Sequence, residues 1–498
     1  MEPESKKLKL TGGVQLNVSM PSGQFAALSL PLEGTVLDLK LAAQQSLGQP
    51  FLRLVAPDGR LLNPTEPLQV SGLQSGDYIT AVAQQPKVAA TDGAMALWCA
   101  GSDRIVTWGS PYFAGNSAGV RDQLKNVQQI HATRDAFAAI LADGSVVTWG
   151  NRFHGGDSTR VRDQLKNVQQ IDATGDAFAA ILADGSVVTW GNPDHGGNSA
   201  GVRDQLNNVK RICATKSAFA AVLAHGSVVT WGDPNGGGDS TRVRDQLRNV
   251  QQIYATRYAF AAILADGSLV TWGIPDLGGD SAGVRDQLRL RHVQQIYATG
   301  SAFAAILGDG SVVSWGDPDC GGDTTGVRDE LRNVEQIHAT HHAFAAILAD
   351  GSVVTWGNPD CGGDRARVRD QLKNVKQICA THSAFAAILA DGSVVTWGDP
   401  NNGGDSTRVR NQLKNIQQIH ATLHTFAAIP ADGSVVTWGN PAFVGDSTRV
   451  RDQLRNVQQI YATRYAFAAI LADGRVVTWG SQFDGNDSTG VNDQLIRL

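Results

Sequence analysis

The sequence predicts a mainly β protein, in which a small α+β domain at residues 13–84 precedes an array of ten 41-residue repeats. The block V-V-T-W-G recurs along the chain, and its Trp returns at intervals of 41 residues, as at Trp108, Trp149 and Trp190, except for an interval of 43 between Trp272 and Trp315 that reflects a two-residue insertion. The 498 residues include 55 Gly, and charged residues make up only 18%. A Gly-rich chain with few charges is typical of turn-rich β structure.

The first half of the small domain predicts a hairpin followed by a helix. Apolar and polar residues alternate between 14 and 18, as in a half-buried strand, and residues 25–30 form a second strand after a Ser-Gly turn. Thr35 is a suitable N-cap, because its hydroxyl can accept from the free N–H groups of a first helical turn. The helix extends to Leu47 with one apolar face, and Gly48 ends it.

The second half predicts another hairpin, between residues 51–55 and 60–62, and a last strand at 78–83. This order of elements, and the sequence T-V-L-D-L-K at the start of the helix, resemble ubiquitin. The resemblance implies a ubiquitin-like β-grasp domain. The recognition patch that it implies consists of Val55, Gly59, Thr80 and Val82. The domain ends without Gly-Gly, so we expect a fixed docking module that is not released and conjugated.

Each repeat predicts three antiparallel strands. In the unit that starts at Val127, they are V-Q-Q-I-H-A-T, A-F-A-A-I-L and V-V-T-W-G. An Ala-Asp-Gly-Ser turn joins the last two, and Asp-Gly between apolar runs favours a hairpin. The fourth segment, V-R-D-Q-L, is either an irregular outer strand or a single helical turn. We expect the array to occupy residues 87–498 and residues 1–12 to be a disordered N-terminus.

The repeat core, I-x-A-T-x-x-A-F-A-A-I-L-A-D-G-S-V-V-T-W-G, resembles the repeat of regulator-of-chromosome-condensation proteins and of a bacterial β-lactamase inhibitor protein of the same fold. The resemblance implies a β-propeller-like array. It departs at Thr133 and Ala136, where the family has Gly and His, and in a repeat number larger than is usual. The repeats therefore either close into one ring or form an open arc. Residues 481–498 supply one more linking segment, which would close a ring by packing beside the first repeat.

Three places vary between repeats that are otherwise nearly constant: the residue after the Ile of the first strand, the two residues after Ala-Thr, and the residues after Trp-Gly. An antiparallel meander brings all three to the same end of a blade, so we expect them on one face of the array. Tyr and His concentrate there, and Tyr is enriched at protein interfaces. The residues predicted to bind a partner on this variable face are Tyr112, His131, Arg134, Asp135, Asp172, Lys216, Tyr254, Arg257, Tyr258, Tyr297, His338, His341, His342, His382, His420, His424, Tyr461, Arg464 and Tyr465.

Other kinds of site are less well supported by the sequence. The recurring Trp is expected to be a packing residue, because every repeat has it. Histidines concentrate around His341 and His382, yet equivalent positions of neighbouring blades are expected to lie too far apart to share an ion. We therefore predict no metal site and no cofactor. No catalytic motif stands out from the repeat, which predicts that the protein is not an enzyme.

These observations predict a non-enzymatic scaffold or adaptor. The repeat face would hold a protein client, and the N-terminal domain would dock on ubiquitin- or proteasome-related machinery. The family resemblance implies an alternative, a guanine-nucleotide exchange factor or chromatin-associated regulator of a small GTPase; a metal- or small-ligand-binding module is a third. The net charge of -5, without long runs of one sign, predicts neither a nucleic-acid nor a membrane partner. Cysteines without CxxC spacing and a start without a signal-like apolar stretch predict a cytoplasmic or nuclear location.

Overall fold

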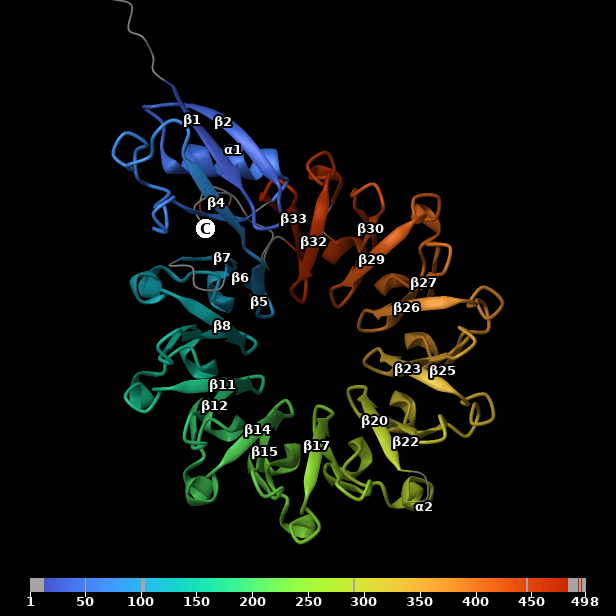
Figure 1. Ribbon diagram of the computed structural model, residues 1–498. Coiled ribbons are helices and arrows are strands. Elements are labelled where there is room, and N and C mark those ends of the chain that lie inside the picture. Colours follow the sequence, from blue (N-terminus) through green and yellow to red (C-terminus); the bar gives the residue numbers. More distant parts are fainter. Residues whose placement is uncertain are drawn as a thin grey trace, which may run out of the picture.

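The chain forms a ring of small β-sheets, with the N-terminal domain seated over one point of the ring (Figure 1). The computed structural model describes residues 13–49, 51–99, 104–289, 292–444, 447–481, 491 and 494. The sheets follow one another around the ring in sequence order. Residues 1–12, predicted to be disordered, lie outside the described residues.

The N-terminal domain is a mixed sheet with the strand order β2-β1-β4-β3, packed on one helix. Its elements are β1 (Gly13–Ser19), β2 (Phe25–Pro31), α1 (Val36–Leu47), β3 (Leu52–Val55) and β4 (Tyr78–Ala83). β1 pairs antiparallel with β2 and parallel with β4, and β3 pairs antiparallel with β4. The apolar side of the sheet and the apolar face of α1 share one core, as the alternation between residues 14 and 18 predicts.

The ends of α1 confirm the caps predicted from sequence. The Thr35 hydroxyl accepts from the Asp38 backbone N–H at 3.3 Å, and the Asp38 carboxylate accepts from the Thr35 N–H at 2.7 Å. Gly48 ends the helix in the left-handed conformation, at φ 63°. The second predicted hairpin is present in a minimal form. Leu61 bridges Val55, and the Leu62 N–H donates to the Leu54 carbonyl at 2.9 Å, but residues 60–62 do not extend into a full strand.

Within the described residues, the repeats form ten three-stranded antiparallel sheets, which we call blades. The first strands are β5 (Pro86–Ala90), β8 (Val127–Ala132), β11 (Val168–Ala173), β14 (Val209–Ala214), β17 (Val250–Ala255), β20 (Val293–Ala298), β23 (Val334–Ala339), β26 (Val375–Ala380), β29 (Ile416–Ala421) and β32 (Val457–Ala462). The second strands are β6 (Ala94–Cys99), β9 (Ala136–Leu141), β12 (Ala177–Leu182), β15 (Ala218–Leu223), β18 (Ala259–Leu264), β21 (Ala302–Leu307), β24 (Ala343–Leu348), β27 (Ala384–Leu389), β30 (Thr425–Pro430) and β33 (Ala466–Leu471). The third strands are β7 (Ile105–Gly109), β10 (Val146–Gly150), β13 (Val187–Gly191), β16 (Val228–Gly232), β19 (Leu269–Gly273), β22 (Val312–Gly316), β25 (Val353–Gly357), β28 (Val394–Gly398), β31 (Val436–Gly439) and β34 (Val476–Gly480).

The strands run between the outer rim of the ring and its centre, as the arrows of β11, β17 and β26 show (Figure 1). The turns after the first strands surround a central opening. The Ala-Asp-Gly-Ser turns therefore lie at the outer ends of the blades. In one of them, Asp143 Oδ1 accepts from the Ser145 N–H at 2.9 Å and from its hydroxyl at 2.6 Å, which stabilises the predicted hairpin.

Neighbouring blades are joined by an apolar layer built from repeat residues. Phe178 is fully buried, and its ring lies 5.2 Å from that of Trp190, over the small Ala136 and Ala138 of the preceding blade. The Trp190 indole N–H donates to the carbonyl of Gly155 at 3.0 Å, 35 residues earlier. A side chain at Gly155 would collide with Phe178. The Trp therefore has the packing role that its recurrence predicts.

The fourth segment of the repeat is a short helical turn, which resolves the alternative that the sequence left open. Most copies form 3-10 turns such as η2 (Ala118–Gln123), and the copy with a two-residue insertion forms α2 (Arg285–Arg289). α3 (Pro441–Val444) is another short helix, in the loop after the ninth blade's third strand. Val161 and Leu165 from one such turn pack between two blades. The segment thus links blades without adding a strand.

The first and last blades meet, so the ring is closed (Figure 1). Met95 and Trp108 of the first blade share an apolar cluster with Ala468 and Ile470 of the last blade. Val491, 4% exposed, lies in the same cluster, at the position that Val161 has between other blades. The position of Val491 supports the prediction that residues 481–498 close the ring by packing beside the first repeat. Most of that segment lies outside the described residues.

The N-terminal domain packs on the seam between the first and last blades. Phe51, which precedes β3, is 2% exposed and belongs to the apolar cluster of the seam. Lys40 of α1 is buried, and burial lowers its pKa to about 8. Cys99, at the end of β6, is close enough for its charge to act on Lys40, and burial raises the Cys99 pKa to about 11. None of the described helices has the length and apolar character needed to span a bilayer.

Candidate functional site

The inner ends of the blades are held by the constant Thr of the Ala-Thr pair. The Thr215 hydroxyl accepts from the Ala218 N–H at 3.0 Å and donates to the carbonyl of Gly236, in the loop after the third strand, at 2.9 Å. The turn after the first strand and the loop after Trp-Gly are thereby fixed to one another. Two variable residues follow this Thr, so each blade presents them in the same frame. The variable places do lie at one end of the blade, as the meander predicts.

The first variable residue after Ala-Thr joins a circle of backbone hydrogen bonds, which we call the inner circle. The His341 N–H, for example, donates to the carbonyl of His382 in the next blade at 2.9 Å. In the described residues, the inner circle passes in this way through Asp92, Arg134, Gly175, Lys216, Arg257, Gly300, His341, His382, Leu423 and Arg464. These positions therefore surround the central opening and do not spread over a flat face, which refines the sequence prediction.

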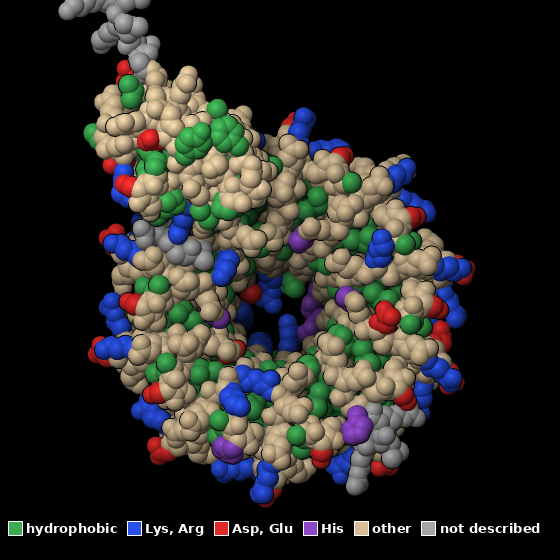
Figure 2. All heavy atoms as spheres, viewed as in Figure 1, with side chains coloured by type: hydrophobic (Ala, Val, Ile, Leu, Met, Phe, Trp, Pro, Cys, Tyr) green, Lys and Arg blue, Asp and Glu red, His purple; other side chains and the backbone are tan. Residues whose placement is uncertain are grey.

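The central opening is lined by polar and basic residues. A cavity of about 630 Å³ is bounded by Ala, Thr and inner-circle residues from seven consecutive blades. Lys or Arg and His side chains are visible inside the opening (Figure 2). Arg134 pairs with Asp176 at 2.6 Å, and Arg464 pairs with Asp92. Lys216 and Arg257 form no ion pair within the described part of the chain, so they are free to meet an acidic ligand.

The second variable residue after Ala-Thr contacts the loop after the third strand. His154 Nδ1 lies 2.6 Å from the carboxylate of Asp135, and His195 Nδ1 lies 2.6 Å from that of Asp176. Burial acts to raise the pKa of Asp176, but the hydrogen bonds from Arg134 and His195 outweigh burial and leave it below the usual value. These contacts make the Asp176 region a charged part of the inner ends of the blades, which together we call the inner rim.

The aromatic members of this second position form a stack near the seam. The His424 ring lies 4.6 Å from the Phe443 ring and 5.9 Å from the Tyr465 ring. His424 Nδ1 also contacts the Asn402 amide oxygen at 2.7 Å. Tyr258, the equivalent residue of another blade, is half-buried. His424 and Tyr465 therefore contact other side chains of the ring, which leaves only part of their surface available to a partner.

The variable residue of the first strand is half-buried between blades, not freely exposed. The residues of this kind are His131, Asp172, Cys213, Tyr254, Tyr297, His338, Cys379, His420 and Tyr461. The Tyr254 hydroxyl donates to the side chain of Gln252 at 2.6 Å. Burial lowers the pKa of His338 and raises that of Asp172 to about 6. These residues contribute mostly to the joints between blades.

The most exposed aromatic side chains belong to the loops after Trp-Gly. Tyr112 is 85% exposed, and Phe153, its equivalent in the next repeat, is 68% exposed. The Arg152 guanidinium lies 5.1 Å from the centre of the Phe153 ring. The predicted residue set contains Tyr112 but leaves out Phe153 and His154. Their variation after Trp-Gly was the signal that identifies them.

Three histidines lie together at the inner rim, contrary to the expectation that equivalent positions are too far apart. The rings of His341 and His382, on neighbouring blades, are 4.6 Å apart, and His342 lies 4.6 Å from His341. The expectation was wrong because radial strands converge at the centre, where the inner circle joins successive turns directly. Burial, helped by the charge of Arg257, lowers the pKa of His341 to about 3, and burial lowers that of His382 to about 4, so these two rings are neutral at physiological pH. Burial also lowers the pKa of His342.

His342 also contacts a thiol, a pairing found in some catalytic sites. Cys320 Sγ lies 3.2 Å from His342 Nδ1, and Cys320 is 4% exposed. Burial and the carboxylate of Asp317 raise the pKa of this thiol to about 12. A nucleophilic Cys needs a lowered pKa and access to solvent, and Cys320 has neither. The contact orients His342 and does not indicate catalysis.

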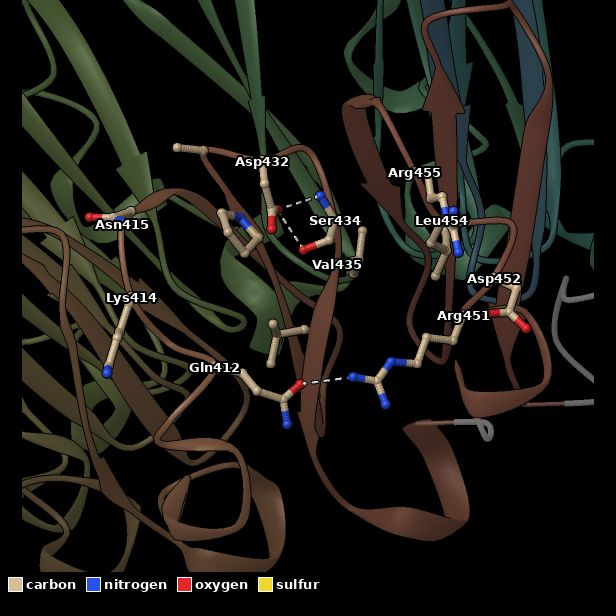
Figure 3. A pocket seen from close by; sticks show the side chains of 13 residues that line it. Gln412, Lys414, Asn415, Asp432, Ser434, Val435, Arg451, Asp452, Leu454 and Arg455 are labelled. Carbon is tan, nitrogen blue, oxygen red and sulfur yellow. Dashed lines mark hydrogen bonds between the residues drawn. The ribbon is translucent and has the colours of Figure 1, made fainter.

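A second cavity lies at the outer end of the ninth blade, between the linking segments before and after that blade (Figure 3). Its walls come from the Ala-Asp-Gly-Ser turn and the linking segment, which recur in other repeats. Arg451 donates to Gln412 across it at 3.4 Å, and Arg162 makes the same contact to Gln123 at 3.1 Å. A contact repeated from blade to blade is structural, so this cavity is not a candidate site.

The residues of the predicted ubiquitin-like patch lie on adjoining strands of the N-terminal domain. Val55 and Thr80 are register partners, and Val82 follows Thr80 on the same face of β4. Gly59 occupies the turn after β3. Leu61, 53% exposed, and Tyr78, 66% exposed, extend this face with apolar area that the sequence did not single out. An alternating pattern in β4 was the available signal for Tyr78.

No protein-family model matches the chain, and no curated protein matches it. Among solved structures, Prp20p from Saccharomyces cerevisiae, described with its binding to Gsp1p and histones, is 18% identical, covers 48% of this chain and 73% of its own, and has a TM-score of 0.31. Human WBSCR16 is 17% identical, with 63% and 90% covered and a TM-score of 0.29. A ubiquitin-like domain from Arabidopsis thaliana is 15% identical, with 16% and 88% covered and a TM-score of 0.14. These values are too low to assign a family or a function.

Proposed function

We propose that the protein is a non-enzymatic binding scaffold. The inner ends of the blades hold a protein partner, and the N-terminal domain, a ubiquitin-like module, docks on a component of the ubiquitin pathway. The observation that carries the proposal is the convergence of variable residues from many blades on one opening, within a frame that is constant from repeat to repeat. Repeat proteins commonly recognise partners with variable positions on a constant frame.

The chemistry of the inner rim favours a partner segment that carries acidic and apolar groups. Lys216 and Arg257 have no acidic partner within the described residues, and a carboxylate would complete their pairing. Tyr112 and Phe153 offer exposed aromatic area, which suits protein contacts. The cavity of about 630 Å³ accepts an extended segment and not a folded domain.

A quantitative pull-down from native lysate tests the rim. The rim variant carries Tyr112→Asp and Phe153→Asp, because another repeat has Asp194 at the equivalent position. It also carries Lys216→Gly and Arg257→Gly, because Gly175 and Gly300 occupy the equivalent positions of two other repeats. Because each new residue already occurs at that place in the array, we expect the variant to fold. A protein captured by the intact chain should be lost or reduced at least tenfold by the variant.

The matched control removes two cations from the outer ends of the blades, with Lys125→Ser and Lys166→Ser; both residues are exposed. It should retain the partner. If the rim variant retains the same partners as the intact chain, or the outer control loses them equally, the inner rim is not the binding surface.

The docking role of the N-terminal domain is tested separately. Val82, 37% exposed on β4, is changed to Ser, and Val70, 67% exposed outside the sheet, is changed to Ser as the control. We expect only the Val82 variant to lose ubiquitin- or proteasome-related proteins from the pull-down. Retention of such proteins by both variants, or their absence from the intact chain, contradicts this role.

A further inference from the structure

The cluster of His341, His342 and His382 has the composition and spacing of a metal site. Each residue offers one ring nitrogen, and the three nitrogens lie within 4.8 Å of one another. Nitrogen ligands at about 2.0–2.1 Å from a tetrahedral Zn²⁺ are about 3.4 Å apart. Small changes in the side-chain torsions therefore bring the three rings to ligand distance.

The backbone already holds two of the ligands in register. His341 and His382 are adjacent members of the inner circle, joined by the 2.9 Å hydrogen bond between their backbones. The preceding member of the circle is Gly300, and a side chain there would occupy the space of the His341 ring. The cluster thus depends on three successive repeats that carry Gly, His-His and His at the positions after Ala-Thr. This combination occurs once in the array.

The surroundings of His342 complete the arrangement. Its Nδ1 lies 3.2 Å from Cys320 Sγ, so Nε2 is the nitrogen left to bind an ion. A metal-bound His is commonly oriented by a contact to its other nitrogen. Cys320 is 4% exposed, so this contact to the thiol is enclosed and orients the His342 ring.

We propose that His341, His342 and His382 bind one divalent transition-metal ion, of which Zn²⁺ is the probe, at the inner rim. Imidazole suits zinc, copper and nickel, and three His with a fourth position open to water is a known zinc arrangement. His341 and His382 line the central opening, from which an ion can enter. Arg257 and Arg464 act on His341 electrostatically; they oppose a dication and thereby limit its affinity.

Isothermal titration of tag-free, full-length protein with Zn²⁺ tests the site. The intact chain should bind one ion at this site. The variant His341→Gly with His342→Ser reproduces the pair Gly300-Ser301 of the preceding repeat, and His382→Lys reproduces Lys216. Each variant should bind Zn²⁺ at least tenfold more weakly at this site than the intact chain, and Zn²⁺ should raise the Tm of the intact chain but not that of the two cluster variants.

The control is His131→Tyr, which removes a histidine of another blade and installs the residue found at Tyr254. It should bind Zn²⁺ like the intact chain. The proposal is overturned if both cluster variants, shown by circular dichroism to be folded, bind Zn²⁺ with unchanged affinity and stoichiometry. It is also overturned if the intact chain shows no saturable binding at millimolar Zn²⁺.

Discussion

Arg464 of the last blade donates to the carboxylate of Asp92 in the first blade at 2.5 Å, across 372 positions of sequence. Both residues belong to the inner circle, in which the other neighbours are joined through their backbones. Here a side-chain pair connects the two ends of the array. Burial raises the pKa of Asp92, although the charge of Arg464 opposes this shift. The pair therefore adds an electrostatic contact to the apolar seam.

A double-mutant cycle should detect this closing contact. Arg464→Leu copies Leu423, and Asp92→Gly copies Gly175. Because both side chains are partly exposed, we expect a coupling energy of about 0.5–1 kcal/mol in urea unfolding. The exposed pair Arg475 and Asp473, within one turn, is the control and should couple more weakly. Additive effects of the two closing substitutions would indicate that the pair does not contribute to closure.

The Thr of the inner turn should be a determinant of stability. Thr215→Val keeps the shape of the side chain but removes the hydroxyl that bridges Ala218 and Gly236. The buried N–H and carbonyl then lose their partner, at a cost of about 1–3 kcal/mol in the free energy of unfolding. Chemical denaturation measures the loss. Thr80→Val, on an exposed position of β4, should change stability by less than about 0.5 kcal/mol; equal losses would count against the bridge.

The contact between the N-terminal domain and the seam predicts a stability role for Phe51. Phe51→Ala removes a ring that is 2% exposed in the seam cluster, which costs about 3–5 kcal/mol. Phe25→Ala, at a ring that is 55% exposed, should cost much less. Hydrogen exchange should locate the loss: β6 and β33 should exchange faster in the Phe51 variant. Unchanged exchange in both strands would show that the domain does not support the seam.

Asp172 predicts a dependence of stability on pH. Burial raises its pKa to about 6 in the folded protein, against about 3.9 when unfolded. The folded state keeps the proton at pH values where the unfolded state has lost it, so stability falls as pH rises from 4 to above 6. Asp172→Asn should therefore stabilise the protein by about 1–2 kcal/mol at pH 7.5 and have little effect at pH 4, allowing for partial exposure. An equal effect at both pH values would contradict the shift.

The strands of each blade could be predicted from sequence because their determinants are local. Alternation, the Asp-Gly turn and the Thr35 and Gly48 caps each act within a few residues, and each appears in the structure. The pairing of residues 60–62 with β3 is shorter than predicted, with a single bridge at Leu61. A local sequence pattern does not show where such pairing ends.

The direction of the strands and the histidine cluster could not be predicted in the same way. Strand pairing within a blade is the same whether strands run along the axis or along radii. The radial direction arises from contacts between blades, such as Phe178 on Ala136 and Ala138. It brings His341 and His382 together and leaves Tyr254 between blades. Variation between repeats identified candidate binding residues. It did not separate exposed side chains, such as Tyr112, from half-buried side chains, such as Tyr254.

Site-specific photo-crosslinking can show whether a protein partner binds the inner rim. A benzophenone amino acid would replace Tyr112 or Phe153 at the inner end of a blade, and Ala142 in the exposed turn at the outer end. We expect a crosslinked partner from positions 112 and 153 and none from position 142. Crosslinks from 142 alone, or equally from all three positions, would contradict it.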